Sequence, residues 1–138
     1  MIAYVDSSVL LRMALMQPNR LAEYEAIESA VASALVEVEC LRTLDRLRIA
    51  HRVDDEEVAR RRAFVYASLE RMDTIEVARA VLARAAQPLP TSLATLDAIH
   101  LASALEWQDR SGTRLVLATH DAALAMAARA CGMRVLGA

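Results

Sequence analysis

Four acidic residues stand at positions where an α/β protein places its catalytic groups: Asp6, Glu39, Asp97 and Asp121. The first and the last each follow an apolar run, at residues 2–5 and 115–120. The other two lie in helical patterns, each within about a turn or two of a plausible helix start. Because strand ends and helix starts meet at one edge of a parallel sheet, four distant carboxylates can share one pocket. Such a pocket offers oxygen ligands to a hard cation, Mg²⁺ or Mn²⁺, and suits phosphodiester chemistry.

Each of these acids also has a simpler explanation. Asp6 and Asp121 stand where a helix N-cap is expected, and capping alone accounts for an Asp there. Asp97 lies near a helix start, where the helix dipole favours an acid. Its neighbours on both sides are apolar, however, and a buried acid is rarely unpaired. His100 follows one turn later and can share the same face, more typically as a hydrogen-bonded neighbour than as a metal ligand.

The helical stretch that carries Glu39 also carries Glu37, two residues earlier. Residues at i and i+2 of a helix point to nearly opposite faces, about 200° apart. Only one of the two can therefore face a given pocket, and position alone does not choose between them.

Composition limits the classes of protein to which the chain can belong. Its 138 residues predict one domain, residues 1–138, with one core, and 56% hydrophobic residues exclude disorder. A net charge of −2 gives no overall attraction to nucleic acid, so any basic surface must be local. All sixteen basic residues are arginine, which excludes a Schiff-base lysine and a P-loop lysine.

The two cysteines, Cys40 and Cys131, form neither a disulfide framework nor a zinc motif, and we expect small buried hydrophobes. We expect no signal peptide, because Asp6 and Arg12 interrupt the first apolar stretch. The longest uncharged runs are too short for a membrane span. These features predict a protein of the reducing cytoplasm without membrane association.

The elements that position the acids follow from hydrophobic periodicity, in which short β-like runs alternate with helical stretches, as in α/β folds. The predicted strands are residues 2–5, 30–32, 74–77, 114–118 and 133–136. The predicted helices are 7–16, 20–29, 34–50, one from the acidic stretch 53–57 to 71, one ending near 86, one ending at 107 and 121–131. Thr91, Ser92 and Thr95 compete to cap the helix ending at 107, and Gly132 is the expected C′ glycine of the last helix. Five strands with intervening helices imply a parallel sheet with right-handed crossovers.

Four segments carry recognisable motifs in order, at residues 4–8, 33–42, 96–102 and 118–121, with a closing strand at 132–135. Together they resemble the PIN-domain ribonucleases, and more narrowly the VapC-type toxins of bacterial toxin–antitoxin pairs. The second segment ends in a Glu-x-x-Arg pattern, Glu39 to Arg42, and this resemblance selects Glu39 over Glu37.

The resemblance implies a three-layer α/β/α sandwich over a parallel sheet of about five strands. It also implies an Mg²⁺- or Mn²⁺-dependent endoribonuclease in which the cation activates the water that attacks phosphorus. The catalytic and metal-binding residues would be Asp6, Glu39, Asp97 and Asp121. The residues expected to support them, or to contact substrate, are Ser7, Ser8, Arg42, His100 and Thr119.

The resemblance further implies partners: an RNA substrate, a cognate antitoxin and commonly a second copy of the chain in a homodimer. The antitoxin would lie in a groove near the helix at 7–16. That helix is apolar nearly all round, so it is either deeply buried or covered by a partner. The arginines at 60–62 are expected to pair with Glu56 and Glu57 on a solvated face.

Other uses of an aspartate-rich pocket fit less well. A receiver-like phosphoacceptor domain requires a lysine, and a haloacid-dehalogenase-type phosphatase would have a second Asp where this chain has Ser8. Two alternatives remain: a non-catalytic binding module with the same fold, and a housekeeping PIN nuclease without an antitoxin.

Overall fold

A five-stranded parallel sheet lies at the centre of the computed structural model, which describes residues 1–138. The strands are β1 (Ile2–Val5), β2 (Ser29–Ser33), β3 (Met72–Ile75), β4 (Val116–Ala118) and β5 (Arg134–Leu136). Their order across the sheet is β3-β2-β1-β4-β5, and every neighbouring pair is parallel. The predicted parallel sheet of five strands is confirmed.

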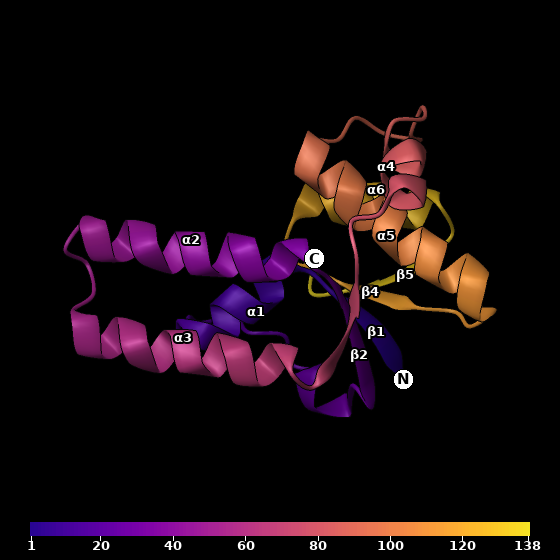
Figure 1. Ribbon diagram of the computed structural model, residues 1–138. Coiled ribbons are helices and arrows are strands. Elements are labelled where there is room, and N and C mark those ends of the chain that lie inside the picture. Colours follow the sequence, from indigo (N-terminus) through magenta and orange to yellow (C-terminus); the bar gives the residue numbers. More distant parts are fainter.

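Six α-helices and one short 3₁₀ helix connect the strands. They are α1 (Ser7–Ala14), η1 (Tyr24–Ala26), α2 (Leu35–Ile49), α3 (Asp55–Leu69), α4 (Arg79–Ala85), α5 (Thr95–Ser111) and α6 (Ala122–Ala130). Figure 1 shows α2 and α3 side by side as a long pair that extends from the sheet, with α4, α5 and α6 grouped apart from them. None of the helices is long and apolar enough to cross a membrane.

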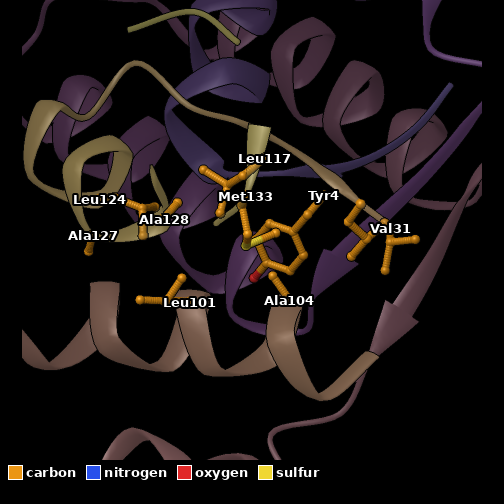
Figure 2. Close-up of a cluster of buried hydrophobic side chains, with 10 residues drawn as sticks. Tyr4, Val31, Leu101, Ala104, Leu117, Leu124, Ala127, Ala128 and Met133 are labelled. Atoms are coloured by element: carbon orange, nitrogen blue, oxygen red, sulfur yellow. The ribbon is translucent and has the colours of Figure 1, made fainter. Parts of the chain in front are cut away.

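Alternating strand residues explain the layers, because successive side chains of a strand point to opposite faces. Tyr4, Val31 and Leu117 pack against α5 and α6, as Figure 2 shows for the first of two large apolar clusters. Ala32 faces the other way and joins the cluster of α1, α2 and α3. Both faces of the sheet are therefore covered by helices, and the predicted three-layer sandwich is confirmed.

The predicted helix at 20–29 is wrong. Only Tyr24–Ala26 forms a 3₁₀ turn, and Ser29 already begins β2. Leu21, Tyr24 and Ile27 repeat every three residues, a spacing that favours a helix. The chain instead turns to pair with β1: the Glu28 N–H donates to Met1 O, and Ser29 is in register with Ile2. Pairing between distant segments overrides the local helical preference.

The remaining differences concern boundaries. β3 begins at Met72, two residues before its predicted start, and α1 ends at Ala14 instead of residue 16. The competing caps for α5 are also wrong, because Ala94 precedes the helix and makes no side-chain cap, so Thr95 is its first residue. Gly132 follows the C-cap of α6 with a φ of 79°, which confirms it as the C′ glycine.

Candidate active site

The order of the strands creates a switch point between β1 and β4, where connections leave the sheet in opposite directions. Ligands of doubly wound folds bind in the crevice beyond the carboxyl ends of such strands. Asp6 follows β1 and Thr119 follows β4. The two strand ends are joined, because the Asp6 N–H donates to Ala118 O over 3.0 Å. The predicted acids nearest the strand ends therefore lie where the topology places a binding site.

Asp6 is buried, and hydroxyl groups hold its carboxylate. Its Oδ2 accepts hydrogen bonds from Ser8 Oγ at 2.6 Å, from Thr119 Oγ1 at 2.9 Å and from the Ser8 N–H at 3.3 Å. Ser7 Oγ lies 3.5 Å from Oδ1. Asp6 is also the N-cap of α1. One carboxylate thus caps a helix and is oriented by the residues expected to support it.

Asp121 is tied to the same group of hydroxyls. Its backbone N–H donates to Thr119 Oγ1 over 2.9 Å, and Thr119 in turn donates to Asp6. The Asp121 side chain caps α6, since Oδ1 accepts the Leu124 N–H at 2.8 Å. Capping therefore occupies one carboxylate oxygen of Asp121, while Thr119 links the ends of β1 and β4.

Glu39, and not Glu37, lies beside these residues. Its Oε1 is 2.5 Å from His100 Nε2, and the same ring nitrogen is 3.7 Å from Asp6 Oδ1. Glu37, on the same helix, is exposed and takes part in none of these contacts. The structure thus brings together Asp6, which follows β1, Glu39 of α2 and His100 of α5.

Asp97 lies in the first turn of α5, and the negative charges of the three other acids act on its carboxyl group. Its pKa is raised, first by burial and then by the negative charges of Asp121, Asp6 and Glu39, with His100 acting in the opposite direction. The charges of the other three acids therefore reach Asp97, and each of them opposes its ionisation. A divalent cation is the charge that relieves such repulsion.

The donor set suits Mg²⁺ or Mn²⁺ by its chemistry, because all four side chains supply carboxylate oxygens. As the side chains lie here, no group of three or more His, Cys, Asp or Glu residues is arranged to hold a metal ion. Asp6 and Asp121 are turned toward helix N-termini, and Glu39 toward His100. Ligand chemistry and charge fit a cation, and coordination requires the oxygens that these contacts leave free, such as Glu39 Oε2, to come closer together.

Cys40 lies next to Glu39 in the sequence but is no candidate nucleophile. Burial, followed by the charges of Glu39 and Asp6, raises the pKa of its thiol to about 12. A thiolate is the nucleophilic form, so this cysteine is unreactive at neutral pH. Both cysteines are free, and Cys131 is only half-buried.

The arginines divide into paired and unpaired groups. Arg60 pairs with Glu56 at 3.0 Å and with Glu57, and Arg61 also pairs with Glu57, which confirms the expectation for these two arginines. Arg62 forms no such pair and donates to the Tyr66 hydroxyl over 3.2 Å. Arg42 is exposed, lies one turn after Glu39 and forms none of the salt bridges of the molecule. It does not neutralise the acids by direct contact, so its guanidinium is free to meet a ligand.

Tyr4 is the residue of the site that sequence reasoning missed. It was placed only in a buried strand, yet its hydroxyl lies 2.7 Å from His100 Nδ1. The sequence did contain one indication of this contact, because the hydroxyl of a buried tyrosine normally forms a hydrogen bond. What the sequence did not supply was the partner, which lies 96 residues away.

Comparisons with known proteins agree with this fold. A PIN domain model matches residues 3–130. Ribonuclease VapC46 of Mycobacterium tuberculosis is 34% identical over 137 residues, 96% of this chain and 95% of that protein. VapBC2 from Rickettsia felis, solved with a DNA fragment from its promoter, has a TM-score of 0.68 at 11% identity and covers 98% of this chain and 97% of its own. VapC20 of Mycobacterium tuberculosis, a Sarcin-Ricin loop cleaving toxin, has a TM-score of 0.62 at 15% identity and covers 92% of this chain and 95% of its own.

Proposed function

Because this chain belongs to the PIN domain family, we propose that it is a metal-dependent endoribonuclease that acts as the toxin of a toxin–antitoxin pair. The observation that carries the proposal is the meeting of Asp6 and Glu39, from distant segments, at His100, whose Nε2 lies 3.7 Å from Asp6 Oδ1 and 2.5 Å from Glu39 Oε1. The raised pKa of Asp97, to which the charges of Asp121, Asp6 and Glu39 contribute, supports the same grouping. A relative 34% identical over nearly the whole chain is named a ribonuclease, which supports the same activity. Acids of like charge that lie together at a switch point repel one another and destabilise the fold, but the same arrangement is suited to binding a cation.

Asp6, Glu39, Asp97 and Asp121 would hold Mg²⁺ or Mn²⁺. Bound there, the cation supplies an activated water and stabilises negative charge on the phosphate. The role of the neighbouring side chains is to orient the carboxylates. Ser8 and Thr119 fix the carboxylate of Asp6 through Oδ2 and leave Oδ1 with the long hydrogen bond from Ser7 and with His100 Nε2 at 3.7 Å. Outer hydrogen bonds of this kind orient metal ligands and tune their basicity.

Arg42 is the best-placed group for an RNA phosphate. It lies one helical turn from Glu39, is exposed and has no acidic partner. A guanidinium binds phosphate oxygens through two parallel N–H groups. Since the net charge is −2, such a local cation near the acids supplies an attraction that the whole molecule lacks.

An RNA cleavage assay with and without EDTA tests the nuclease proposal. Wild-type protein should cut in Mg²⁺ or Mn²⁺ and lose activity in EDTA, and Asp97→Ala should lose it in either cation. Glu37→Gln is the matched control, because it removes an exposed acid from the helix that carries Glu39 and should cut like wild type. Cleavage that survives both the chelator and Asp97→Ala would overturn the proposal.

A non-catalytic PIN-fold module is the second candidate, and one observation favours it: the side chains as placed do not form a metal site. Such a module would bind RNA or a protein without cutting. The same assay separates the two, because binding of RNA in a gel shift without cleavage in either cation would assign the module.

The antitoxin site that we propose is a groove of about 490 Å³ between α1, η1 and α3, with a mainly hydrophobic set of lining residues and charged groups from Glu25, Glu28 and Arg71. Met13, Tyr24, Ile27, Phe64 and Met72 supply most of its apolar lining. Val9 and Leu10 of α1 are buried in the core, so the apolar surface of this helix is shared between core and groove. An amphipathic segment that lays its apolar side in such a groove follows a common mode of peptide recognition.

Phe64→Glu tests this docking site. The side chain is 38% exposed, so a charge there should leave the fold intact and weaken antitoxin binding by tenfold or more, about 1.4 kcal/mol. The partner to use is the product of the small gene expected immediately upstream. Met126→Glu is the control, since Met126 is an exposed residue of α6 outside the groove. Unchanged inhibition of Phe64→Glu would contradict the docking site, and the absence of such a gene would favour a housekeeping nuclease.

A further inference from the structure

A chain of polar side chains passes through the core and ends at Glu39. Tyr4 and His100 are both fully buried. The Tyr4 hydroxyl is 2.7 Å from His100 Nδ1, and His100 Nε2 is 2.5 Å from Glu39 Oε1. Figure 2 shows the Tyr4 ring among apolar side chains between the sheet and α5, with its hydroxyl toward that helix. The three residues come from β1, α5 and α2.

This arrangement is costly unless it is complete. A hydroxyl or imidazole buried without a partner costs a few kcal/mol, whereas a fully hydrogen-bonded network makes a rigid core. Apolar residues such as Leu117 and Leu101 fill the same cluster around Tyr4 without any such requirement. The polar chain is therefore more than a way of filling the core.

The direction of the hydrogen bonds follows from the partners. His100 Nε2 faces Glu39 Oε1 and, at 3.7 Å, Asp6 Oδ1, and ionised carboxylates only accept. Nε2 therefore carries a hydrogen and donates it to Glu39. Nδ1 and the Tyr4 hydroxyl, 2.7 Å apart, share a hydrogen bond that holds the ring from its other side. Burial keeps the hydroxyl protonated by raising its pKa far above the ordinary value.

Glu39 needs such a restraint. Its side chain is 23% exposed, and a free glutamate samples several rotamers whose ordering costs entropy. Hydrogen bonding occupies Oε1 alone, and Oε2 accepts no hydrogen bond. One oxygen is thus held by a buried group, while the other is left for a ligand.

We propose that His100 and Tyr4 are positioning residues. His100, supported by Tyr4, holds Oε1 of Glu39 by a hydrogen bond, so that Oε2 faces the cation. The inference rests on the proposed metal-dependent function and adds two residues to it. His100 touches Glu39 directly, and Tyr4 acts through His100 by holding its ring in place.

Mn²⁺ binding measured by calorimetry tests the proposal without relying on catalysis. Tyr4→Phe keeps the aromatic ring in the core and removes only the hydroxyl, so it should weaken Mn²⁺ binding by about tenfold. His100→Leu should weaken it at least as much, and His100→Gln, which retains a side-chain N–H, should weaken it less. Tyr66→Phe is the control: it removes the hydroxyl of an exposed tyrosine on α3 and should bind Mn²⁺ like wild type.

A double-mutant cycle separates positioning from a general loss of structure. In a Glu39→Gln background Tyr4→Phe should change the Mn²⁺ affinity by less than about twofold, because the carboxylate it positions is gone. A merely structural tyrosine would weaken binding equally in both backgrounds. Thermal melts of each variant show whether it is folded, and Tyr4→Phe decides the matter if His100→Leu does not fold.

The outcomes separate this inference from the proposed function. If wild type binds Mn²⁺ and cuts RNA while folded Tyr4→Phe binds Mn²⁺ with the same affinity, the positioning role is overturned and the nuclease stands. An equal loss of affinity in both backgrounds would also overturn it. If wild type binds no Mn²⁺ and cuts no RNA, the proposed function and this inference fail together.

Discussion

Asp97 is the residue at which the conflict between stability and function is most visible. Burial and three neighbouring carboxylates raise its pKa above the ordinary value of 3.8. The folded chain therefore holds a proton on Asp97 to a higher pH than the unfolded chain does. At a pH above the pKa of Asp97 in the unfolded chain, this acid lowers the free energy of unfolding. The destabilisation reaches its full size once the pH exceeds the pKa of Asp97 in the folded chain.

Asp97→Asn should accordingly stabilise the metal-free protein at neutral pH while abolishing cleavage. The gain should stay below about 1 kcal/mol, because the side chain is partly exposed and solvent screens its charge. It should disappear as the pH falls below the unfolded pKa, where both states are protonated. Urea unfolding in EDTA measures the difference, most cleanly between about pH 3.5 and 5.5, where His100 remains charged in either state.

A wild-type protein that is more stable than Asp97→Asn at neutral pH in EDTA would contradict this prediction. It would mean that Asp97 gains more from the helix dipole and from His100 than it loses to its acidic neighbours. Asp73→Asn is a suitable control, since Asp73 lies on the exposed part of β3 and should show no such gain.

For single residues, the sequence predicted the place of a side chain relative to strands and helices better than it predicted the side chain's hydrogen-bond partners. Asp6 and Asp121 were recognisable because each follows an apolar run, and the capping role of both residues follows from that position. The contact between Tyr4 and His100 was beyond reach, since it depends on how α5 packs across β1. A tyrosine two residues before Asp6 indicates that some partner exists, but the partner is determined only by packing.

Among the helices, α2 carries both Glu39 and a row of arginines. Arg42 and Arg46 follow Glu39 by three and seven residues, so all three share one side of the helix. Arg46 donates only to the Thr43 hydroxyl, at 3.0 Å, and neither arginine has an acidic partner. Arg48 differs, because it pairs with Asp45 at 2.8 Å. For the RNA substrate that we propose, the unpaired arginines would line a path toward Glu39.

Arg42→Ala and Arg46→Ala should each weaken binding of a single-stranded RNA and reduce the salt dependence of the affinity by about one unit of slope. Arg48→Ala is the matched control and should change neither, since its charge is already balanced. Fluorescence anisotropy over a range of salt concentrations in EDTA measures binding without cleavage. An equal effect of all three substitutions would mean that the charge of the helix, and not a defined path, attracts RNA.

The elements also show where local patterns mislead. The helices α2 and α3 were predicted to within a few residues, because long amphipathic repeats and the acids at the start of α3 are local signals. The predicted helix at 20–29 was wrong, since pairing of Ser29 with Ile2 is a contact between distant segments. Thr91, Ser92 and Thr95 are good caps by type, yet α5 begins without any side-chain cap. Its start is determined by packing against α4 and the sheet.

Across the whole molecule, the candidate site exists only when the chain is folded. Its acids come from residues 6, 39, 97 and 121, so the unfolded chain has no comparable arrangement. A cation that binds the folded state alone stabilises it, by about 2.7 kcal/mol at a hundredfold excess over Kd. For a chain of this size that corresponds to a rise in Tm of roughly 5 to 10 °C.

Mg²⁺ or Mn²⁺ should therefore raise the Tm of wild-type protein in proportion to the logarithm of its concentration, and EDTA should remove the effect. Glu39→Gln should lose most of the shift, whereas Glu37→Gln should keep it, because only Glu39 lies beside Asp6 and His100. The two substitutions remove the same charge from the same helix, so non-specific screening affects both equally. If Glu39→Gln keeps the same shift in Tm as Glu37→Gln, Glu39 is not a ligand of the cation. The choice between the two glutamates would then be as open as the sequence alone leaves it.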